Sequence, residues 1–296
     1  MATEQIDPRY VDLDAWPTSD IIAAIYDGQV AAAGAVRGAL KSITAAVEDA
    51  VPALQRGGRL VYVGAGTSGR IGVQDGSELP PTFDWPSDRL VFAMAGGLEA
   101  LIRSAEGAED DESAGAKAMV DAKVGPNDVV MGIAASGTTP FTIGALRAAS
   151  AAGAVTIAIA NNAGAPIFAT ARHHIFAETG SEVIAGSTRM KAGTAQKIIL
   201  NLISTTIMVK MGRVYRGLMV DMRARNAKLR RRAQAIVSQL ARCSENEAAG
   251  YLEKTGGELK AAVLVALGLE PNEATRLLEH HGRNLRAAIA AMRGDG

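Results

Sequence analysis

Short apolar runs alternate with longer helical patterns through the central part of the chain. The runs have the length and composition of buried parallel strands. They lie at residues 59–64, 89–95, 128–134, 154–160 and 174–177. Helical patterns separate most of them, at residues 98–106, 112–122 and 141–152. This alternation predicts an α/β fold in which helices cover both faces of a five-stranded parallel sheet.

The two flanks of this region have different patterns. Residues 1–18 are polar and contain Pro8 and Pro17, which is typical of an arm, and helical patterning follows to about residue 54. After the last strand, residues 186–240 are helical with a break near 212–217. We therefore expect an N-terminal arm with helices at 1–54, an α/β domain at 55–240 and a small helical domain at 241–296.

The last part of the chain contains a short internal repeat. Its first copy holds Ala248, Leu252, Gly256, Leu259 and Ala262. The same residue types recur 26 positions later, at Ala274, Leu278, Gly282, Leu285 and Ala288. Each copy predicts a helix, a glycine turn and a second helix.

Composition excludes several classes of function. Lys and Arg together number 31, as do Asp and Glu, so the net charge is zero and nucleic acid is not an expected partner. A single cysteine, Cys243, excludes an intrachain disulfide and a multi-cysteine metal site. The four histidines form two adjacent pairs, a spacing that does not suit a metal site. No metal is therefore expected.

The N-terminal residues show no basic region followed by an apolar run, and the longest apolar runs are interrupted by Lys, Arg or Gly. These features predict neither a signal peptide nor a membrane span. We expect a cytoplasmic protein.

A glycine-rich loop follows the first expected strand. Gly64, Gly66 and Gly69 match the G-x-G-x-x-G pattern of dinucleotide-binding folds. That interpretation needs an acidic residue at the end of the second strand, and Asp84 falls before that strand. The alternative is a phosphate site, in which Gly66, Thr67 and Ser68 offer hydroxyl and backbone N–H groups at the start of a helix.

A second hydroxyl-rich loop favours the phosphate site. Ser136, Gly137, Thr138 and Thr139 follow the third expected strand, and Pro140 is placed as a first helical residue. These hydroxyls would otherwise only cap helices. Because two such loops converge at the carboxyl ends of parallel strands, binding of a small phosphorylated ligand is the better interpretation.

Two carboxylates and one basic segment complete the candidate site. Glu78 lies just before Pro80 and Pro81, and Glu109 lies in an acidic run; an isolated Glu is more often a solvated side chain. The segment 182–197 offers four further groups that either bind a phosphate or carboxylate or belong to an ordinary helix. These are Ser187, Arg189, Lys191 and Lys197.

Several of these segments resemble the N-acetylmuramic acid 6-phosphate etherases, a family built on the SIS (sugar isomerase) phosphosugar-binding fold. The matching motifs lie at residues 63–70, 77–82, 106–110, 132–137, 186–197 and 218–221. The resemblance covers about residues 55–296. It implies a three-layer αβα SIS domain with a small C-terminal helical domain, a sugar-phosphate substrate, no cofactor, and a homodimer with sites near the interface.

The resemblance also implies the chemistry. An etherase of this family opens the sugar to its aldehyde, removes the proton on C2, and protonates the C3 ether oxygen as D-lactate leaves. Water then adds to the unsaturated aldehyde and N-acetylglucosamine 6-phosphate results. By family position Glu78 is the acid on the lactyl oxygen and Glu109 a second acid or base, provided that their environments separate their pKa values.

Three alternatives remain open. A non-catalytic sugar-phosphate sensor, such as the glucokinase regulatory protein, shares the fold but contains two such modules, whereas this chain has one. A sugar-phosphate isomerase of the same fold would release no lactate. A nicotinamide enzyme would bind NAD.

Overall fold

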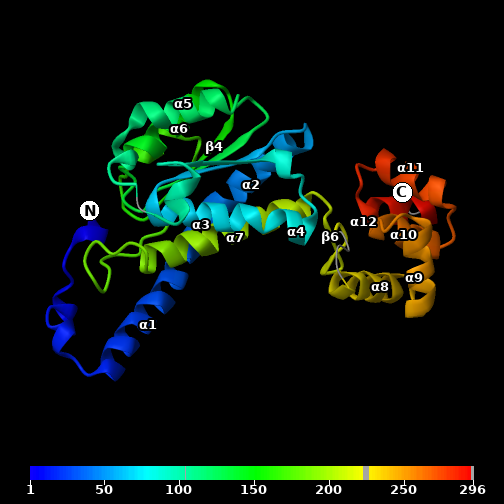
Figure 1. Cartoon of the computed structure of the whole chain (residues 1–296), viewed down its shortest axis with the longest axis horizontal. Helices are drawn as coiled ribbons and strands as arrows, with labels where there is room; N and C mark the ends of the chain where they lie inside the picture. Colours follow the sequence, from blue (N-terminus) through cyan, green and yellow to red (C-terminus); the bar gives the residue numbers. More distant parts are fainter. Residues whose placement is uncertain (104, 223–226, 295–296) are drawn as a thin grey trace. The chain divides into compact units, whose positions relative to one another are not determined.

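A computed structural model describes residues 1–103, 105–222 and 227–294. Contacts within the chain divide it into two compact units. The first comprises Met1–Ser77 and Ser87–Thr206, and the second comprises Glu78–Pro86 and Ile207–Gly296. Figure 1 shows the elements of both and labels the main helices.

The first unit is built on a five-stranded parallel sheet in the order β2-β1-β3-β4-β5. Residues of β1, β3 and β4 are all buried, which explains why these strands are continuous apolar runs. The strands are β1 (Leu60–Gly64), β2 (Leu90–Met94), β3 (Val129–Ile133), β4 (Val155–Ala160) and β5 (His173–Phe176). The predicted α/β class and five-stranded parallel sheet are confirmed.

Helices cover both faces of this sheet, as Figure 1 shows. On one face α6 contacts β1, β3 and β4, and α5 packs on α6. On the other, α3 contacts β1, β2 and β3, and α2 contacts β3, β4 and β5. These helices and their neighbours are α2 (Leu40–Gln55), α3 (Gly66–Ser77), α5 (Glu112–Asp121), α6 (Pro140–Ala151) and α7 (Lys191–Lys210). The result is the three-layer αβα arrangement.

The N-terminal region precedes this sandwich with short 3-10 turns and a long helix. The turns are η1 (Ala2–Glu4), η2 (Pro8–Tyr10) and η3 (Leu13–Ala15). Helix α1 (Thr18–Ala35) continues through η4 (Val36–Ala39) into α2, and α1 buries only Gly28 and Ala32. By length and composition alone, the stretch Thr18–Gln55 is long and apolar enough to cross a membrane. Core helices of soluble proteins pass the same test, so its length and composition are weak evidence for a membrane span.

One expected helical segment, at residues 98–106, differs in the structure. Within residues 98–106 the structure has only the 3-10 turn η6 (Leu98–Leu101), and position 104 lies outside the described residues. The flanking Gly96, Gly97 and Gly107 all have positive φ, so the backbone turns where the pattern predicted a helix. The remaining 3-10 turns are η5 (Ser87–Arg89), η7 (Ala108–Asp110) and η8 (Pro166–Thr170).

The break expected near residues 212–217 is a small β-hairpin, β6 (Val214–Tyr215) with β7 (Leu218–Met219). Its turn is formed by Arg216 and Gly217, whose φ angles are 50° and 77°. Positive φ at both central residues is the requirement of a tight hairpin turn. Residues 223–226, which the helical prediction included, lie outside the described residues.

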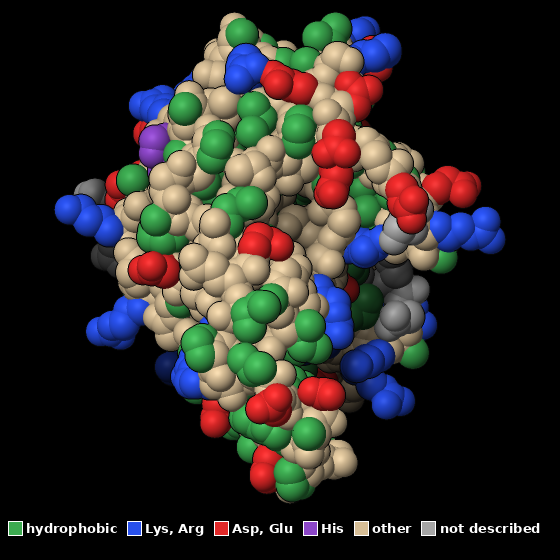
Figure 2. All heavy atoms as spheres, turned by 90° about the vertical axis from the view of Figure 1, so that its left-hand side faces the viewer, with side chains coloured by type: hydrophobic (Ala, Val, Ile, Leu, Met, Phe, Trp, Pro, Cys, Tyr) green, Lys and Arg blue, Asp and Glu red, His purple; other side chains and the backbone are tan. Residues whose placement is uncertain are grey.

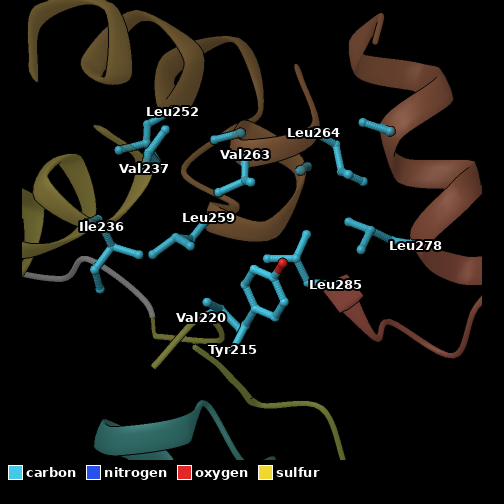
Figure 3. Close-up of a cluster of buried hydrophobic side chains, with 14 of the residues drawn as sticks. Tyr215, Val220, Ile236, Val237, Leu252, Leu259, Val263, Leu264, Leu278 and Leu285 are labelled. Atoms are coloured by element: carbon cyan, nitrogen blue, oxygen red, sulfur yellow. The ribbon is translucent and has the colours of Figure 1, made fainter. Parts of the chain in front are cut away.

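The second unit contains short helices around a separate apolar core (Figure 3). Its elements are α4 (Leu79–Phe83), α8 (Ala227–Ala241), α9 (Glu245–Lys254), α10 (Leu259–Ala266), α11 (Pro271–His280) and α12 (Leu285–Arg293). The repeat predicted above corresponds to α9–α10 and α11–α12, with Gly256 and Gly282 at positive φ between them. The predicted pattern of helix, glycine turn and helix is confirmed.

Arg213 holds the segment Glu78–Pro86 within the second unit. Its guanidinium donates to the carbonyl oxygens of Phe83 at 2.6 Å and Asp84 at 3.0 Å, and it lies over the Trp85 ring at 5.1 Å. Lys260, only 1% exposed, donates to Asp221 Oδ2 and to the Arg283 carbonyl, both at 2.6 Å. Arg213 and Lys260 therefore join loops of this unit through hydrogen bonds to their carbonyl oxygens.

Candidate active site

The first unit contains a cavity of about 500 Å³ at the carboxyl ends of β1 and β3. In the observed strand order β2 lies on one side of β1 and β3 on the other, so chain connections leave in opposite directions at this point. Such a switch point is where doubly wound sheets bind ligands. The polar groups lining the cavity come from Glu4, Thr67, Ser68, Glu109, Asp110, Ser136, Thr138, Thr139 and Thr188.

The first loop depends on close contact between β1 and α3. A Cβ at Gly69 would lie 2.9 Å from the Gly64 carbonyl oxygen, and one at Gly64 would lie 2.8 Å from the Gly69 nitrogen. Gly66 has φ +50°, where a side chain is strained. These glycines let the strand pass directly into the first turn of α3. That turn presents Thr67 and Ser68 to the cavity.

Ser68 is braced from behind by buried amides. Its hydroxyl donates to Gln196 Oε1 at 2.9 Å, and Gln196 Nε2 donates to Asn161 Oδ1 at 3.0 Å. Asn161 in turn donates to the Ala177 carbonyl at 3.0 Å. Gln196 and Asn161 are completely buried. This series of hydrogen bonds fixes the Ser68 side chain, because breaking it would leave buried polar groups unpaired at a cost in free energy.

In the second loop the hydroxyl groups bond to one another. The backbone N–H and the hydroxyl of Thr138 donate to Ser136 Oγ at 3.2 and 3.0 Å. Gly137 has φ +72°, and a Cβ there would lie 2.3 Å from Ala165 Cβ. Thr139 occupies the N-cap position of α6 but makes no capping hydrogen bond with its side chain. Its hydroxyl is thus not used in the way that the capping alternative predicts.

The basic segment lies mostly outside this cavity. Lys191 is 9% exposed and donates to the Ser181 carbonyl at 2.7 Å, and burial lowers its pKa, which the Glu182 charge opposes. Glu182 accepts the Lys191 and Ala192 N–H groups at 2.9 Å each and so caps α7. Lys191 and Glu182 therefore brace the start of α7.

The other predicted site residues of segment 182–197 lie outside the cavity lining. Arg189 and Lys197 are exposed, and Lys197 donates to Asn201 Oδ1 at 2.5 Å on its own helix. Ser187 is half-buried and does not line the cavity, whereas its neighbour Thr188 does. Thr188 was not among the residues that the sequence predicted for the site. Among the described residues, the cavity lining holds no Lys or Arg.

Glu109 lines the cavity from the 3-10 turn η7. The preceding Gly107 has φ +73°, which turns the backbone just before this glutamate. Glu109 also borders a smaller adjoining cavity of about 210 Å³, which Arg70 and Glu106 line as well. Glu4 and Asp110, which the sequence did not single out, supply two more carboxylates to the larger cavity.

Glu78 belongs to the second unit. It is exposed and occupies the N-cap position of α4, where its side chain makes no capping hydrogen bond. Its carbonyl accepts the Thr82 N–H at 3.2 Å. The carboxyl group is therefore not engaged in holding α4, and its pairing with Glu109 stays a prediction.

A buried carboxylate anchors α3 one turn before Glu78. Asp75 accepts hydrogen bonds from Tyr62 at 2.9 Å, Asn201 at 2.7 Å and Ser204 at 3.1 Å. Burial raises the pKa of the Asp75 carboxyl, and these hydrogen bonds oppose that shift. The network pins the last turn of α3 to α7, so both ends of α3 are fixed by contacts with distant residues.

Within the described part of the chain, no group of three or more His, Cys, Asp or Glu side chains is arranged to hold a metal ion. Carboxylates, hydroxyls and backbone N–H groups are what the cavity offers instead. Such a set can bind an oxyanion at one position and transfer protons at another.

Comparisons with known proteins identify relatives of this chain. A family model described as the glucokinase regulatory protein N-terminal SIS domain matches residues 42–150, and one described as the SIS domain matches residues 106–205. An N-acetylmuramic acid 6-phosphate etherase of Deinococcus radiodurans is 49% identical over 288 residues, 97% of this chain and 94% of its own. One of Rhizobium rhizogenes is 46% identical over 293 residues, 98% of this chain and 95% of its own.

The chain belongs to the N-acetylmuramic acid 6-phosphate etherase family. The predicted resemblance is thereby confirmed, and it extends beyond residues 55–296 into the N-terminal region. A solved phosphoheptose isomerase of Francisella tularensis matches with a TM-score of 0.50 at 18% identity, covering 66% of this chain and all of the other. At this identity the likeness shows only that the two chains share a fold.

Proposed function

We propose that this chain cleaves the D-lactyl ether of N-acetylmuramic acid 6-phosphate to give N-acetylglucosamine 6-phosphate and D-lactate. The observation that carries this proposal is a sequence identity of 43–49% over at least 97% of the chain to relatives named N-acetylmuramic acid 6-phosphate etherase. Such a reaction returns cell-wall amino sugars to metabolism.

The two hydroxyl loops suit the phosphate of this substrate. Thr67 and Ser68 lie in the first turn of α3, and Thr138 and Thr139 lie just before α6. Helix N-termini carry free N–H groups and a partial positive charge, which favour an anion. The phosphate would thus be held by neutral donors, with no Lys or Arg among the described lining residues.

The chemistry needs only proton transfers and water. In the open aldehyde form the carbonyl acidifies the C2 proton, which a base removes. The electron pair forms the C2–C3 double bond, the C3–O bond breaks, and an acid protonates the departing lactate oxygen. Water then adds its oxygen to C3 and a proton returns to C2. No electrons are gained or lost, so no redox cofactor is required.

We assign the proton transfers to two glutamates. Glu78, whose side chain makes no capping bond, is the acid on the lactyl oxygen, and Glu109, on the cavity wall, is the second acid or base. Each such group contributes roughly 10²–10⁴-fold to the rate. Glu78→Gln and Glu109→Gln should each slow D-lactate release by that factor, with Glu48→Gln on α2 as an exposed control.

The outcome of this experiment separates the alternatives. A non-catalytic sugar-phosphate sensor or an isomerase would release no D-lactate from N-acetylmuramic acid 6-phosphate, whatever the variant. Release at the wild-type rate by Glu78→Gln or by Glu109→Gln would remove that glutamate from the mechanism and leave the etherase activity standing.

We further propose a cytoplasmic homodimer that uses α1 in its interface. Ile22, Tyr26 and Val30 lie four residues apart on α1 and are 63%, 65% and 55% exposed. Figure 2, from the side of the N-terminal segment and α1, shows hydrophobic side chains lying between acidic ones. A row of large apolar side chains at this spacing forms one helix face, which is suited to burial against a second copy.

The oligomeric state tests this part of the proposal separately. Tyr26→Asp should shift a dimer toward monomer in sedimentation velocity, because a charge would be buried in the interface. Asp20→Asn on the same helix is the matched control. A wild-type chain that sediments as a monomer at all concentrations would refute the dimer without touching the chemistry.

A further inference from the structure

The N-terminal tip of the chain reaches the cavity. Glu4 closes the 3-10 turn η1 and is among the residues that line the cavity beside the two hydroxyl loops. Nothing in the local sequence points to a binding role, because positions 1–18 have the composition of a polar arm.

Thr3 anchors this tip. It is completely buried, its N–H donates to Asn162 Oδ1 at 3.3 Å, and its hydroxyl accepts from Asn162 Nδ2 at 3.0 Å. Its carbonyl accepts the Gly186 N–H at 3.0 Å. Three hydrogen bonds to residues distant in sequence make the tip a fixed part of the first unit.

The anchor also joins the tip to both loops that face it. Asn162 is 4% exposed and donates to the Ala135 carbonyl at 3.0 Å, directly before the second hydroxyl loop. Gly186 has φ +75°, and a Cβ there would lie 2.9 Å from Glu4 Oε2. The space beside the Glu4 carboxylate is thus kept open by a glycine two residues before the cavity-lining Thr188.

We propose that Glu4 is a substrate-binding residue, which accepts hydrogen bonds from a sugar hydroxyl or from the acetamido N–H. This inference rests on the proposed function and adds a specificity residue to it. An ionised carboxylate only accepts hydrogen bonds, so it selects neutral donors and repels phosphate and the lactyl carboxylate. Glu4 therefore orients the substrate, with the sugar's donors at the tip and the phosphate at the hydroxyl loops.

Calorimetric titration of the full chain tests this role with two probes, N-acetylglucosamine 6-phosphate and inorganic phosphate. Glu4→Ala should weaken binding of the sugar phosphate by about 10- to 100-fold, the usual worth of a charge-assisted hydrogen bond. Glu4→Gln should fall between, because its amide oxygen still accepts. Inorganic phosphate makes no bond to Glu4, so both variants should bind it at least as tightly as the wild type, because a repelling charge has been removed.

A control variant and a variant of the anchor show whether the change in binding comes from Glu4. Asp12→Asn, an exposed carboxylate of the same segment, should bind both probes as the wild type does. Thr3→Val keeps the shape of the buried side chain but removes its hydroxyl, which accepts from Asn162 at 3.0 Å and donates to Glu4 Oε1 at 3.3 Å, and should weaken sugar-phosphate binding because it loosens the tip that carries Glu4. Thermal melting of each variant shows whether the fold is retained.

Glu4→Ala that binds the sugar phosphate as tightly as the wild type, or more tightly, would overturn the proposal, and tighter binding would show that the tip obstructs the cavity instead. A wild-type chain that binds the sugar phosphate through Glu4 but releases no D-lactate would refute the proposed function alone. A wild-type chain that binds neither probe would refute both.

Discussion

The two hydroxyl loops of the cavity look alike in sequence but are supported in different ways. The loop after β1 is braced by buried amides, since Ser68 donates to Gln196, which donates to Asn161. In the loop after β3 the hydroxyl groups bond within the loop, where Thr138 donates twice to Ser136, while the Gly137 carbonyl accepts the Ile167 N–H at 3.0 Å. The hydroxyl groups of similar loops can therefore be held by a distant side-chain network or by neighbours in the same loop.

This difference shows where rigidity comes from in each loop. The first depends on backbone contact between Gly64 and Gly69 and on a residue more than a hundred positions away. The second depends on Gly137, whose φ of +72° and close neighbour Ala165 exclude a side chain. Mutation should thus affect the two loops through different positions.

Gly137→Ala should destabilise the folded chain more than any other variant of the two loops. The new methyl group would meet Ala165 Cβ at 2.3 Å and would also impose strain at positive φ. Together these should lower the free energy of unfolding by about 2–5 kcal/mol. Gly66→Ala is the matched variant in the first loop, because it has φ +50° but no atom within 4 Å, and should cost only about 1–2 kcal/mol. Equal losses in urea unfolding would contradict this account.

Asp128→Asn tests whether hydrogen bonds at the amino ends of β1 and β3, the strands that carry the two loops, hold these strands together. Asp128 accepts hydrogen bonds from the Arg59 guanidinium at 2.7 and 3.1 Å, from the Arg59 N–H at 2.8 Å and from the Gly125 N–H at 3.0 Å. Burial alone would raise the pKa of Asp128, but these hydrogen bonds outweigh it and lower that pKa. Asp128→Asn should cost about 2–4 kcal/mol at pH 7.

This cost depends on pH in a defined direction. A carboxyl with a lowered pKa stabilises the folded chain above its unfolded pKa of about 3.9, and that stability is lost as pH falls through the lower folded value. Urea midpoints of wild type and Asp128→Asn should therefore approach each other below about pH 4. The exposed Asp88→Asn is the control. A difference that stays constant down to pH 2 would argue against the ion pair.

A smaller effect is expected from Gln196→Leu, which removes the brace behind Ser68 and leaves Asn161 without its donor. The free energy of unfolding should fall by about 1–3 kcal/mol, and phosphate affinity should fall with it. Gln55→Leu, at the exposed end of α2, should change neither. Loss of stability with unchanged phosphate binding would show that the brace does not set the position of Ser68.

The smallest effect on stability is expected from Ser136→Ala. Ser136 is only half-buried and its partners lie within the same loop, so the variant should lose no more than about 1 kcal/mol. Phosphate binding should weaken several-fold, because both the hydroxyl and the position of Thr138 are affected. A stability loss as large as that of Gln196→Leu would remove the contrast between the loops.

Much of the fold could be predicted because its signals are local. Continuous apolar runs such as 128–134 mark strands buried on both faces, and the glycine and hydroxyl residues that follow mark the strand ends. The hairpin at residues 214–219 was missed because two-residue strands are too short to show a period. The helix expected at 98–106 was wrong because its apolar residues are flanked by glycines at positive φ.

The parts of the site that could not be predicted depend on long-range contacts. Lys191 has the residue type of an anion ligand, yet its ammonium donates to the Ser181 carbonyl. In the sequence Gln196 is an ordinary helical residue. Its hydrogen bond to Ser68 becomes evident only from the contact between α7 and α3. Glu4 comes to the cavity through Thr3 and Asn162, which are 159 positions apart.

Elimination followed by hydration at C2 and C3 of the sugar leaves isotopic labels at defined atoms of the products. NMR and mass analysis can locate these labels after the chain has acted on N-acetylmuramic acid 6-phosphate in D₂O and, separately, in ¹⁸O-labelled water. We expect D-lactate without ¹⁸O, together with N-acetylglucosamine 6-phosphate that carries deuterium at C2 and ¹⁸O at C3. Label in the lactate, retained protium at C2, or no lactate at all would contradict this mechanism.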